Sequence, residues 1–429
     1  MMELATDVGP VPRQVGAILV FAPGAGPTAG DVREALAERT RGVPRLRQEL
    51  VRTPPGCGRP VWVDAPDVDV ARHVREVRGP PPGDEAALLR VATGAVTRPL
   101  PSDRPLWSAT LVTGLAGNAR ALIVVFHHVL ADGMGGLAVL ANLVDGVPVP
   151  TPSDDVARSR PSWPRLARDA ASGRLRALAH LPGVPARLRD AVAEMRPGAV
   201  PRAPRCSLNR PVGPRRRLGL VRADLARVRA AGREHGATVN DVVLAAVAGA
   251  LGSLLARRGE SVGHVVASVP VSGRGGATSA ELGNQVGVIP VALPLAGGRS
   301  ERLRSIAAAT RAHRTEARGA SAVLIAPLFR GLAALGVVRW FMERQRLVTT
   351  FVTNLRGPDA PVSFLGSAVS EVVPLALVAG NVAVSFAVLS YAGTLTVTVI
   401  VDEDAFPDAD VLVGALQSEL DGLAPGPGT

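Results

Sequence analysis

Short runs of apolar residues predict β-strands in the first third of the chain. The earliest run is 15–21, and a second strand-like run, 60–64, follows a turn rich in Pro and Gly. Two longer β-rich runs, 106–115 and 120–126, are separated by Ala-Gly-Asn-Ala at 116–119, which is typical of a hairpin turn. We therefore predict a hairpin whose second strand leads directly into a pair of histidines.

Helices are predicted where apolar residues recur three or four positions apart. Asp31 is placed to cap a short helix over 31–39. The pattern at 133–144 has one apolar face, and 224–235 is amphipathic. The run 238–257 is almost wholly apolar, which predicts a buried helix.

The second half of the chain combines further strands with an exposed helix. Strands are predicted at 265–271, 286–293, 347–353, 382–390 and 394–401, and the helix at 302–318. The uncharged run 372–401 is long enough to span a bilayer, but it contains Pro374 and Asn381 and places Ser and Thr at alternate positions. We interpret it as two strands.

The distribution of these elements predicts an α/β protein with two mixed lobes, because strands and helices recur on both sides of a region rich in Pro and Arg. The boundaries that follow are 1–150 for the first lobe, 151–217 for the linker and 218–429 for the second lobe. A length of 429 residues is ample for a large core.

The charge of the chain is strongly basic, with 48 basic and 37 acidic residues and a formal net charge of +11. Every basic residue is arginine, which suggests a coding bias, and only 3% of residues are aromatic. Aromatic stacking platforms for single strands are therefore scarce, and we predict no nucleic-acid partner. The excess is concentrated in 158–217, where 15 arginines face Asp169, Asp190 and Glu194.

Two functions remain open for this basic segment. Tryptophan and leucines are interleaved with its arginines, which is typical of docking on an anionic membrane or lipid droplet. The alternative is a solvated linker. Cys57 and Cys206 form no CxxC pair, and the first residues lack the pattern of a signal peptide, so we expect a reduced, cytoplasmic protein with peripheral membrane contact at most.

The candidate chemistry lies in His-His-Val-Leu-Ala-Asp-Gly at 127–133, at the exit of a predicted strand. Successive strand residues point to opposite faces, so His127 and His128 should have different roles, one structural and one functional. A neutral imidazole accepts a proton from an alcohol at physiological pH, and we assign this role of general base to His128.

The rest of the motif has physical reasons of its own. Asp132 is placed to cap the following helix or to pair with an arginine, and Gly133 lets a substrate approach the imidazole closely because it has no Cβ. A metal site is disfavoured, because the paired histidines diverge and no further His or Cys cluster supplies ligands. A purely structural histidine pair is the other alternative.

The motif matches the HHxxxDG signature of the CoA-dependent acyltransferase superfamily, and its surroundings resemble the bacterial wax ester synthase/diacylglycerol acyltransferase family. The resemblance covers nearly the whole chain. Besides the histidines it rests on Val-Pro-Arg-Leu-Arg at 43–47, the region 70–77 with His73, Pro-Leu-Trp at 105–107, Asn240-Asp241, Val-Pro-Val-Ser-Gly-Arg at 269–274, Leu-Gly-Asn at 282–284 and Thr-Asn-Leu-Arg-Gly-Pro at 353–358.

The resemblance implies two chloramphenicol-acetyltransferase-like lobes with an active-site tunnel between them. It implies that His128 is the base, that His127 and Asp132 support it, and that Arg47 matches the arginine that pairs with the motif aspartate. Asn240 and Asn354 are then candidates for the tunnel wall, although Asn240 and Asp241 at a helix start could equally form a cap, and Asn354, after a strand, a turn.

The implied reaction moves a long-chain acyl group from acyl-CoA to a hydroxyl acceptor, diacylglycerol or a fatty alcohol, without a further cofactor. Arg356 departs from the family pattern within 353–358, as does the N-terminal segment at 7–10. Two alternatives therefore stay open: a non-catalytic homologue that binds lipid or acyl carrier, and an acyltransferase for a specialised-metabolite alcohol. A nucleophilic-serine hydrolase is disfavoured because the chain has no Gly-x-Ser-x-Gly elbow.

Overall fold

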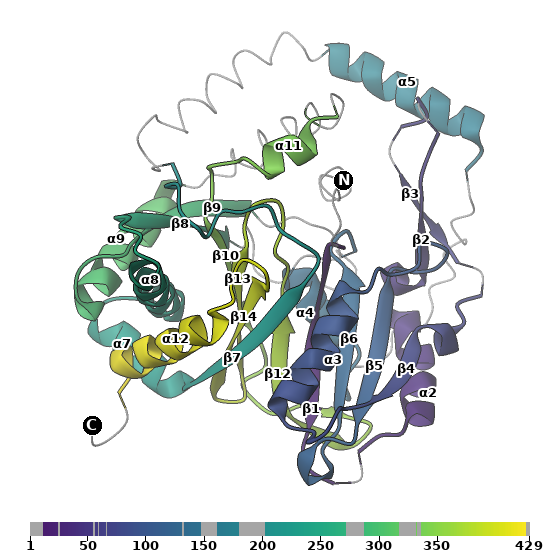
Figure 1. Cartoon of the computed structure of the whole chain (residues 1–429). Helices are drawn as coiled ribbons and strands as arrows, with labels where there is room; N and C mark the ends of the chain where they lie inside the picture. Colours follow the sequence, from purple (N-terminus) through teal and green to yellow (C-terminus); the bar gives the residue numbers. More distant parts are fainter. Residues whose placement is uncertain are drawn as a thin grey trace.

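Figure 1 shows the computed structural model of the protein, in which two lobes are each built on a six-stranded sheet. The structure describes residues 12–24, 26–54, 56–58, 60–65, 67–130, 133–146, 161–179, 202–271, 287–316, 332 and 336–425. Both lobes combine strands and helices, as the sequence predicts.

The sheet of the first lobe has the strand order β11-β12-β1-β6-β5-β4. Four of its strands come from the first third of the chain: β1 (Gln14–Phe21), β4 (Val74–Arg78), β5 (Trp107–Thr113) and β6 (Ala121–His127). β5 and β6 form the predicted antiparallel hairpin, while β4 pairs parallel with β5. A separate small sheet pairs β2 (Gln48–Val51) with β3 (Val61–Asp64).

Three helices cover this first sheet. α2 (Ala29–Arg39) and α4 (Gly133–Ala141) pack on one face, and α3 (Glu85–Thr97) packs on the other. The predicted cap of α2 is wrong by one turn, because Thr28 is the N-cap and accepts a hydrogen bond from the amide of Asp31. The Asp31 carboxylate accepts in return from the amide of Thr28, which completes a capping box.

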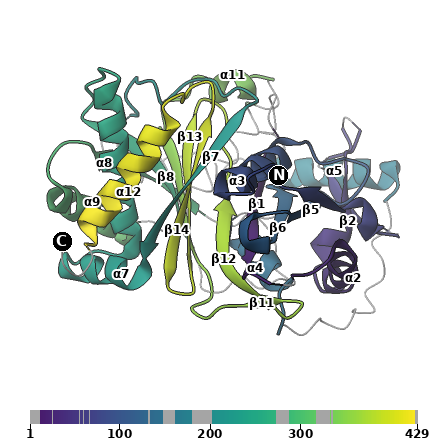
Figure 2. The same ribbon diagram turned by 60° about the horizontal axis from the view of Figure 1, so that its bottom comes forward.

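The sheet of the second lobe has the strand order β7-β14-β13-β10-β8-β9. Helices cover its outer face (Figure 2). The strands are β7 (Arg216–Asp224), β8 (His264–Val271), β9 (Gly287–Pro294), β10 (Thr350–Arg356), β13 (Val384–Tyr391) and β14 (Thr394–Asp402). The covering helices are α7 (Leu225–Glu234), α8 (Val239–Arg257), α9 (Arg299–Glu316) and α12 (Ala409–Leu423).

Helix α8 is the one described helix that is long and apolar enough to cross a membrane, and most of it is buried within the lobe. It packs against α9 and α12, which explains its apolar residues on every side and confirms the predicted buried helix. The prediction of an exposed α9 is only half right, because Leu303 and Ile306 are fully buried against the same core.

The uncharged run 372–401 is confirmed as β-structure, but it contains the end of a third strand besides the two predicted, and this strand leaves the second lobe. β12 (Ser367–Leu375) pairs antiparallel with β1, from Gly16 opposite Leu375 to Phe21 opposite Val369, and β11 (Ser363–Phe364) pairs with β12. In Figure 2, β12 lies between the second sheet and the other strands of the first. The C-terminal half of the chain therefore completes the N-terminal sheet.

Ionic contacts hold the crossing strand β12 between the two lobes. Arg222 of β7 donates two hydrogen bonds to Glu371 of β12, at 2.7 and 2.9 Å, and a third to Glu85 at the start of α3, at 2.5 Å. One guanidinium thus joins both lobes and the crossing strand.

The turn between β11 and β12 is held by Asp145, which follows α4. Its carboxylate accepts from the amides of Leu365 and Gly366, at 2.9 and 2.8 Å, and from Arg39 at 2.5 Å. Burial alone would raise the pKa of Asp145, but the hydrogen bonds from Gly366, Ser363, Arg39 and Leu365 lower it to about 2. The turn therefore stays anchored to a carboxylate that is ionised at neutral pH.

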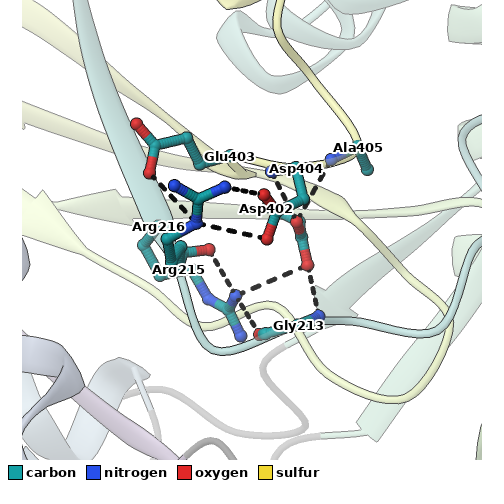
Figure 3. A network of polar contacts seen from close by, with 7 residues as sticks. All are labelled: Gly213, Arg215, Arg216, Asp402, Glu403, Asp404 and Ala405. Atoms are coloured by element: carbon teal, nitrogen blue, oxygen red, sulfur yellow. Dashed lines mark hydrogen bonds and ion pairs between the residues drawn. The ribbon is translucent and has the colours of Figure 1, made fainter.

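A buried ion pair marks the point at which the chain enters the second lobe (Figure 3). Arg216, at the start of β7, lies 3.7 Å from Asp402, at the end of β14, and burial lowers the pKa of Arg216 to about 10 although the charge of Asp402 opposes this. Asp402 also accepts from the amides of Gly213, Asp404 and Ala405. The carboxylate thus fixes the end of the linker and the β14 turn together.

The pairing of β1 with β6 depends on a glycine. A Cβ at Gly16 would lie 2.0 Å from the carbonyl oxygen of Val124, so Gly16→Ala must push the two strands apart. We expect the free energy of unfolding to fall by more than about 2 kcal/mol, measured by urea denaturation. The matched control is Gly94→Ala on α3, where nothing lies within 4 Å of the new Cβ and stability should hold or rise by up to about 1 kcal/mol. Equal losses in the two variants would contradict this account.

Candidate active site

The two histidines lie at the end of β6. The backbone amides of both are held by the chain segments on the two sides of this strand. The amide of His127 donates to the carbonyl of Leu106 at 2.9 Å, and the amide of His128 donates to the carbonyl of Arg13 at 2.8 Å. His127 is the last residue of β6 and is buried, whereas His128 is half-buried and begins the turn that follows. The histidine pair is thus at a strand exit, as the sequence predicts.

The His127 side chain supports this turn. Its Nδ1 accepts a hydrogen bond from the amide of Val129 at 3.1 Å, and its carbonyl accepts from the amide of Leu130 at 2.9 Å. Nδ1 carries no proton in this arrangement, so the ring is held in one tautomer by the backbone that it supports. The His127 ring thus supports the backbone of the turn that follows β6.

Gln14, the first residue of β1, is a supporting side chain that the sequence did not reveal. It lies opposite His127 in the β1–β6 ladder and is buried. Its side-chain amide donates to the carbonyls of Val96 and Arg98, at 2.7 and 2.9 Å, and accepts from the amide of Leu100 at 2.9 Å. A polar residue that precedes an apolar run reads as a surface residue, so nothing in the pattern indicates this role.

Three of the motifs that carry the family resemblance meet beside the histidine turn. The indole of Trp107 stacks on the ring of His73, with centroids 4.3 Å apart, and its N–H donates to the carbonyl of Leu46 at 2.9 Å. His73 Nδ1 is hydrogen-bonded to the carbonyl of Trp107 at 2.9 Å, and burial lowers the pKa of His73 although this bond opposes the shift. Trp107 itself lies opposite Phe126, one residue before the pair. These motifs therefore pack around the strand that presents the histidines.

Asn240 and Asn354, predicted at the tunnel wall, lie together in the second lobe. Nδ2 of Asn354 is 3.4 Å from Oδ1 of Asn240, and both residues are half-buried. The prediction that Asn354 follows its strand is wrong, because the parallel ladder between β10 and β13 continues to Arg356. Asn354 therefore projects from the strand itself.

Asp241 supports the start of α8. Its carboxylate accepts from the amide and hydroxyl of Thr238, both at 2.8 Å, and from the hydroxyl of Thr310 on α9 at 2.7 Å. Thr238 is the N-cap, so the Asn-Asp pair lies in the first turn of the helix. The two neighbouring residues thus differ: Asp241 is buried in the cap, and Asn240 faces the strand of Asn354.

The remaining motif residues are placed less completely. Asp132 lies outside the described residues, so its pairing with Arg47 stays a prediction; Arg47 ends a short 3-10 turn, η2 (Pro44–Arg47), and is half-buried. Gly133 begins α4, which contacts β10 and thus lies between the histidine turn and the strand of Asn354. The tunnel between the histidines and the two asparagines stays a prediction.

Arg356, the departure from the family pattern, lies at the protein surface. Its side chain is 74% exposed and donates to Asp359 at 2.8 Å. Asp359 also forms an ion pair with Arg229 of α7. Arg356 is therefore part of a surface ion pair. Within the described residues, no group of three or more His, Cys, Asp or Glu side chains is arranged to hold a metal ion.

Comparison with known proteins identifies the family. The profile of the wax ester synthase/diacylglycerol acyltransferase catalytic domain matches residues 2–243, and that of the WS/DGAT C-terminal domain matches 282–424. The chain belongs to this family. A putative diacylglycerol O-acyltransferase of Mycobacterium bovis is 30% identical over 419 residues, which is 95% of this chain and 90% of the relative, and a probable diacylglycerol O-acyltransferase of Mycobacterium tuberculosis strain H37Rv has the same values. The predicted enzyme class, an O-acyltransferase, is confirmed.

Solved structures confirm the fold of this family member. The wax ester synthase/diacylglycerol acyltransferase from Marinobacter aquaeolei VT8 has a TM-score of 0.71 at 22% identity and covers 98% of this chain and 97% of that chain. The first condensation domain of the CDA synthetase has a TM-score of 0.64 at 18% identity, over 99% and 94%. The two chloramphenicol-acetyltransferase-like lobes are thus confirmed.

The Asn354 side chain gives a test of the second part of the site. At the predicted tunnel wall, the Asn354 amide is expected to hydrogen-bond one of the two substrates. Loss of this bond in Asn354→Ala should raise the KM of the acyltransferase for that substrate about 5- to 10-fold, while the Tm changes little. Steady-state kinetics with each substrate varied in turn measures this. Asn118→Gly, in the turn after β5 where φ is 55°, is the control and should leave KM unchanged. A fall in Tm without a change in KM would make Asn354 purely structural.

Proposed function

We propose that this acyltransferase moves a long-chain acyl group from acyl-CoA to the hydroxyl of a lipid alcohol, with His128 as general base. The observation that carries the assignment is the position of His128 at the exit of β6, where the turn supported by the His127 ring begins. His127 Nδ1 accepts from the amide of Val129, and His128 is half-buried just beyond the end of β6, with its amide held by the carbonyl of Arg13. Functional groups at a strand exit are presented to a crevice, and this position supports His128 as the imidazole that meets a substrate.

The proposed reaction needs no acyl-enzyme. His128 accepts the proton of the acceptor hydroxyl while its oxygen attacks the thioester carbonyl, and a tetrahedral intermediate forms. The carbon–sulfur bond then breaks, and the imidazolium returns its proton to the departing thiolate. The products are an ester and free CoA, and the imidazole is restored.

For the acceptor we propose diacylglycerol or a long-chain alcohol, because the relatives carry the first in their names and the family description includes wax ester synthesis. The exposed position of Arg356 removes one reason to expect an altered acceptor. A specialised-metabolite alcohol and a non-catalytic lipid-binding role are the alternatives that the same assay separates.

Loss of the base should abolish most turnover. His128→Ala should lower kcat about 10²- to 10⁴-fold, measured as acceptor-dependent release of free thiol from palmitoyl-CoA. Product analysis with diacylglycerol, a long-chain alcohol and a panel of other alcohols identifies the acceptor.

The control for this experiment is His264→Ala, because His264 begins β8 in the other lobe and its ring is hydrogen-bonded to the carbonyl of Arg202 at 3.3 Å. It should keep full activity. Equal rates of wild type and a folded His128→Ala would exclude His128 as the base, and a wild type without acceptor-dependent thiol release would favour the binding protein.

We also propose that the basic segment docks on anionic lipid through α5 (Trp163–Ala179). Arg165, Arg168, Arg174 and Arg176 face only one acidic residue of the helix, Asp169. Leu175, which lies among these arginines, is 67% exposed. Leu166, in contrast, is on the buried side of the helix. α5 rests on the hairpin loop between β2 and β3, where Arg174 donates to the carbonyl of Gly56 at 3.2 Å.

Vesicle flotation tests this docking. The protein should float with vesicles that contain anionic lipid, less so as salt rises, because charges at a membrane surface are screened within about 10 Å at 0.1 M salt. Arg165→Gln combined with Arg168→Gln should weaken flotation. Absence of flotation, or indifference to salt, would exclude the electrostatic contact.

A further inference from the structure

Large apolar side chains on the described surface are concentrated in two short segments. Seven such residues are exposed, and five of them lie in α5 or in residues 337–347: Trp163, Leu175, Val337, Trp340 and Leu347. Scattered single residues would need no explanation, but a concentration of this kind marks an interaction surface. α5 is already assigned to lipid, which leaves 337–347 to be explained.

The second segment has the chemistry of a membrane interface. It contains α11 (Val338–Met342) and the turn that follows, with Trp340 59% and Leu347 57% exposed. Three arginines and one glutamate accompany them in 337–347. The guanidinium of Arg344 lies 5.6 Å from the centroid of the Trp340 ring. An indole beside cationic side chains suits the headgroup level of a bilayer, where one end of the ring is apolar and the other wet.

A buried amide network holds this segment to the second lobe. Gln345 donates to Oδ1 of Asn381 at 2.5 Å, and Asn381 donates to the carbonyl of Gln345 at 2.9 Å. Oε1 of Gln345 accepts from the amides of Leu347 and Val348, at 2.6 and 3.0 Å. The exposed side chains are therefore presented by a fixed backbone, which lowers the entropy that ordering on a partner would cost.

The two segments belong to different lobes and lie on the same side of the molecule. α5 packs on the β2–β3 hairpin of the first lobe, whereas α11 leads into β10 of the second, and both lie along the upper side in Figure 1. A flat partner on that side would contact both lobes at once.

We propose that residues 337–347 are a second contact with anionic phospholipid, so that one membrane surface contacts both lobes. The proposal rests on the docking of α5 and extends it. Charge complementarity supports the occupant, because the arginines of both segments match an anionic headgroup and the apolar side chains between them match its boundary with the acyl chains. Two linked contacts also bind more tightly than either alone.

Vesicles of phosphatidylcholine with and without about one third phosphatidylglycerol test the second contact. Trp340→Ser combined with Leu347→Ser should lower the partition coefficient on anionic vesicles on the order of tenfold. Arg339→Gln combined with Arg344→Gln should lower it by a similar factor and flatten its salt dependence. The matched control is Leu365→Asn, which removes an exposed apolar side chain from the β11–β12 turn at a φ of 51° and should bind as wild type does.

The outcomes separate the two contacts. If the 337–347 variants bind like wild type while the α5 arginine variant loses binding, the second contact is wrong and the α5 docking stands. An equal loss in Leu365→Asn would also overturn the proposal, because the effect would then not be local. Release of thiol with a water-soluble alcohol should stay at the wild-type rate in the 337–347 variants, which separates docking from acyl transfer.

Discussion

The pairing of β12 with β1 is the constraint on which the rest of the structure depends. β1 lies between β12, which comes from the C-terminal half, and β6, which carries the histidines. A shift of the crossing strand would therefore pass through β1 to the amide of His128, which is held by the carbonyl of Arg13. Arg222 holds Glu371 in the middle of β12 and Asp145 holds the turn before this strand, so the relative position of the lobes and the geometry of the histidine turn are set together.

Around the histidine turn, buried polar groups are satisfied by backbone. The Gln14 side chain is hydrogen-bonded to the last turn of α3 and to the loop after it, and the indole N–H of Trp107 donates to the carbonyl of Leu46. Each bond contributes only about 1 kcal/mol, but an unpaired group at the same place would cost more, so each fixes a unique packing. The turn is thus supported by segments far away in sequence, including the motifs around Leu46 and His73.

Local patterns were enough to predict the elements nearest the site. The β5–β6 hairpin, the buried α8 and the position of the histidines at a strand exit follow from periodicity and turn chemistry. The β11–β12 crossing does not, because a strand pattern carries no information about its partner. The same limit explains the error at Asn354: its ladder with β13 extends the strand beyond the point at which turn residues suggest an end. Asp132 lies outside the described residues, so the sequence remains the basis for its role.

A membrane that contacts both lobes would change how the acceptor arrives. Diacylglycerol and long-chain alcohols are nearly insoluble in water, so an enzyme that collects them from a bilayer avoids the cost of moving them through solvent, about 0.8 kcal/mol for each exposed CH₂ group. Acyl-CoA, with its charged headgroup, needs no such contact. The two substrates would then approach from different media, and the crossing strand, which pairs with β1 and is bonded to β7, would hold the lobes together while a lipid enters. Orientation on the bilayer would thereby become part of substrate selection, alongside the shape of the site.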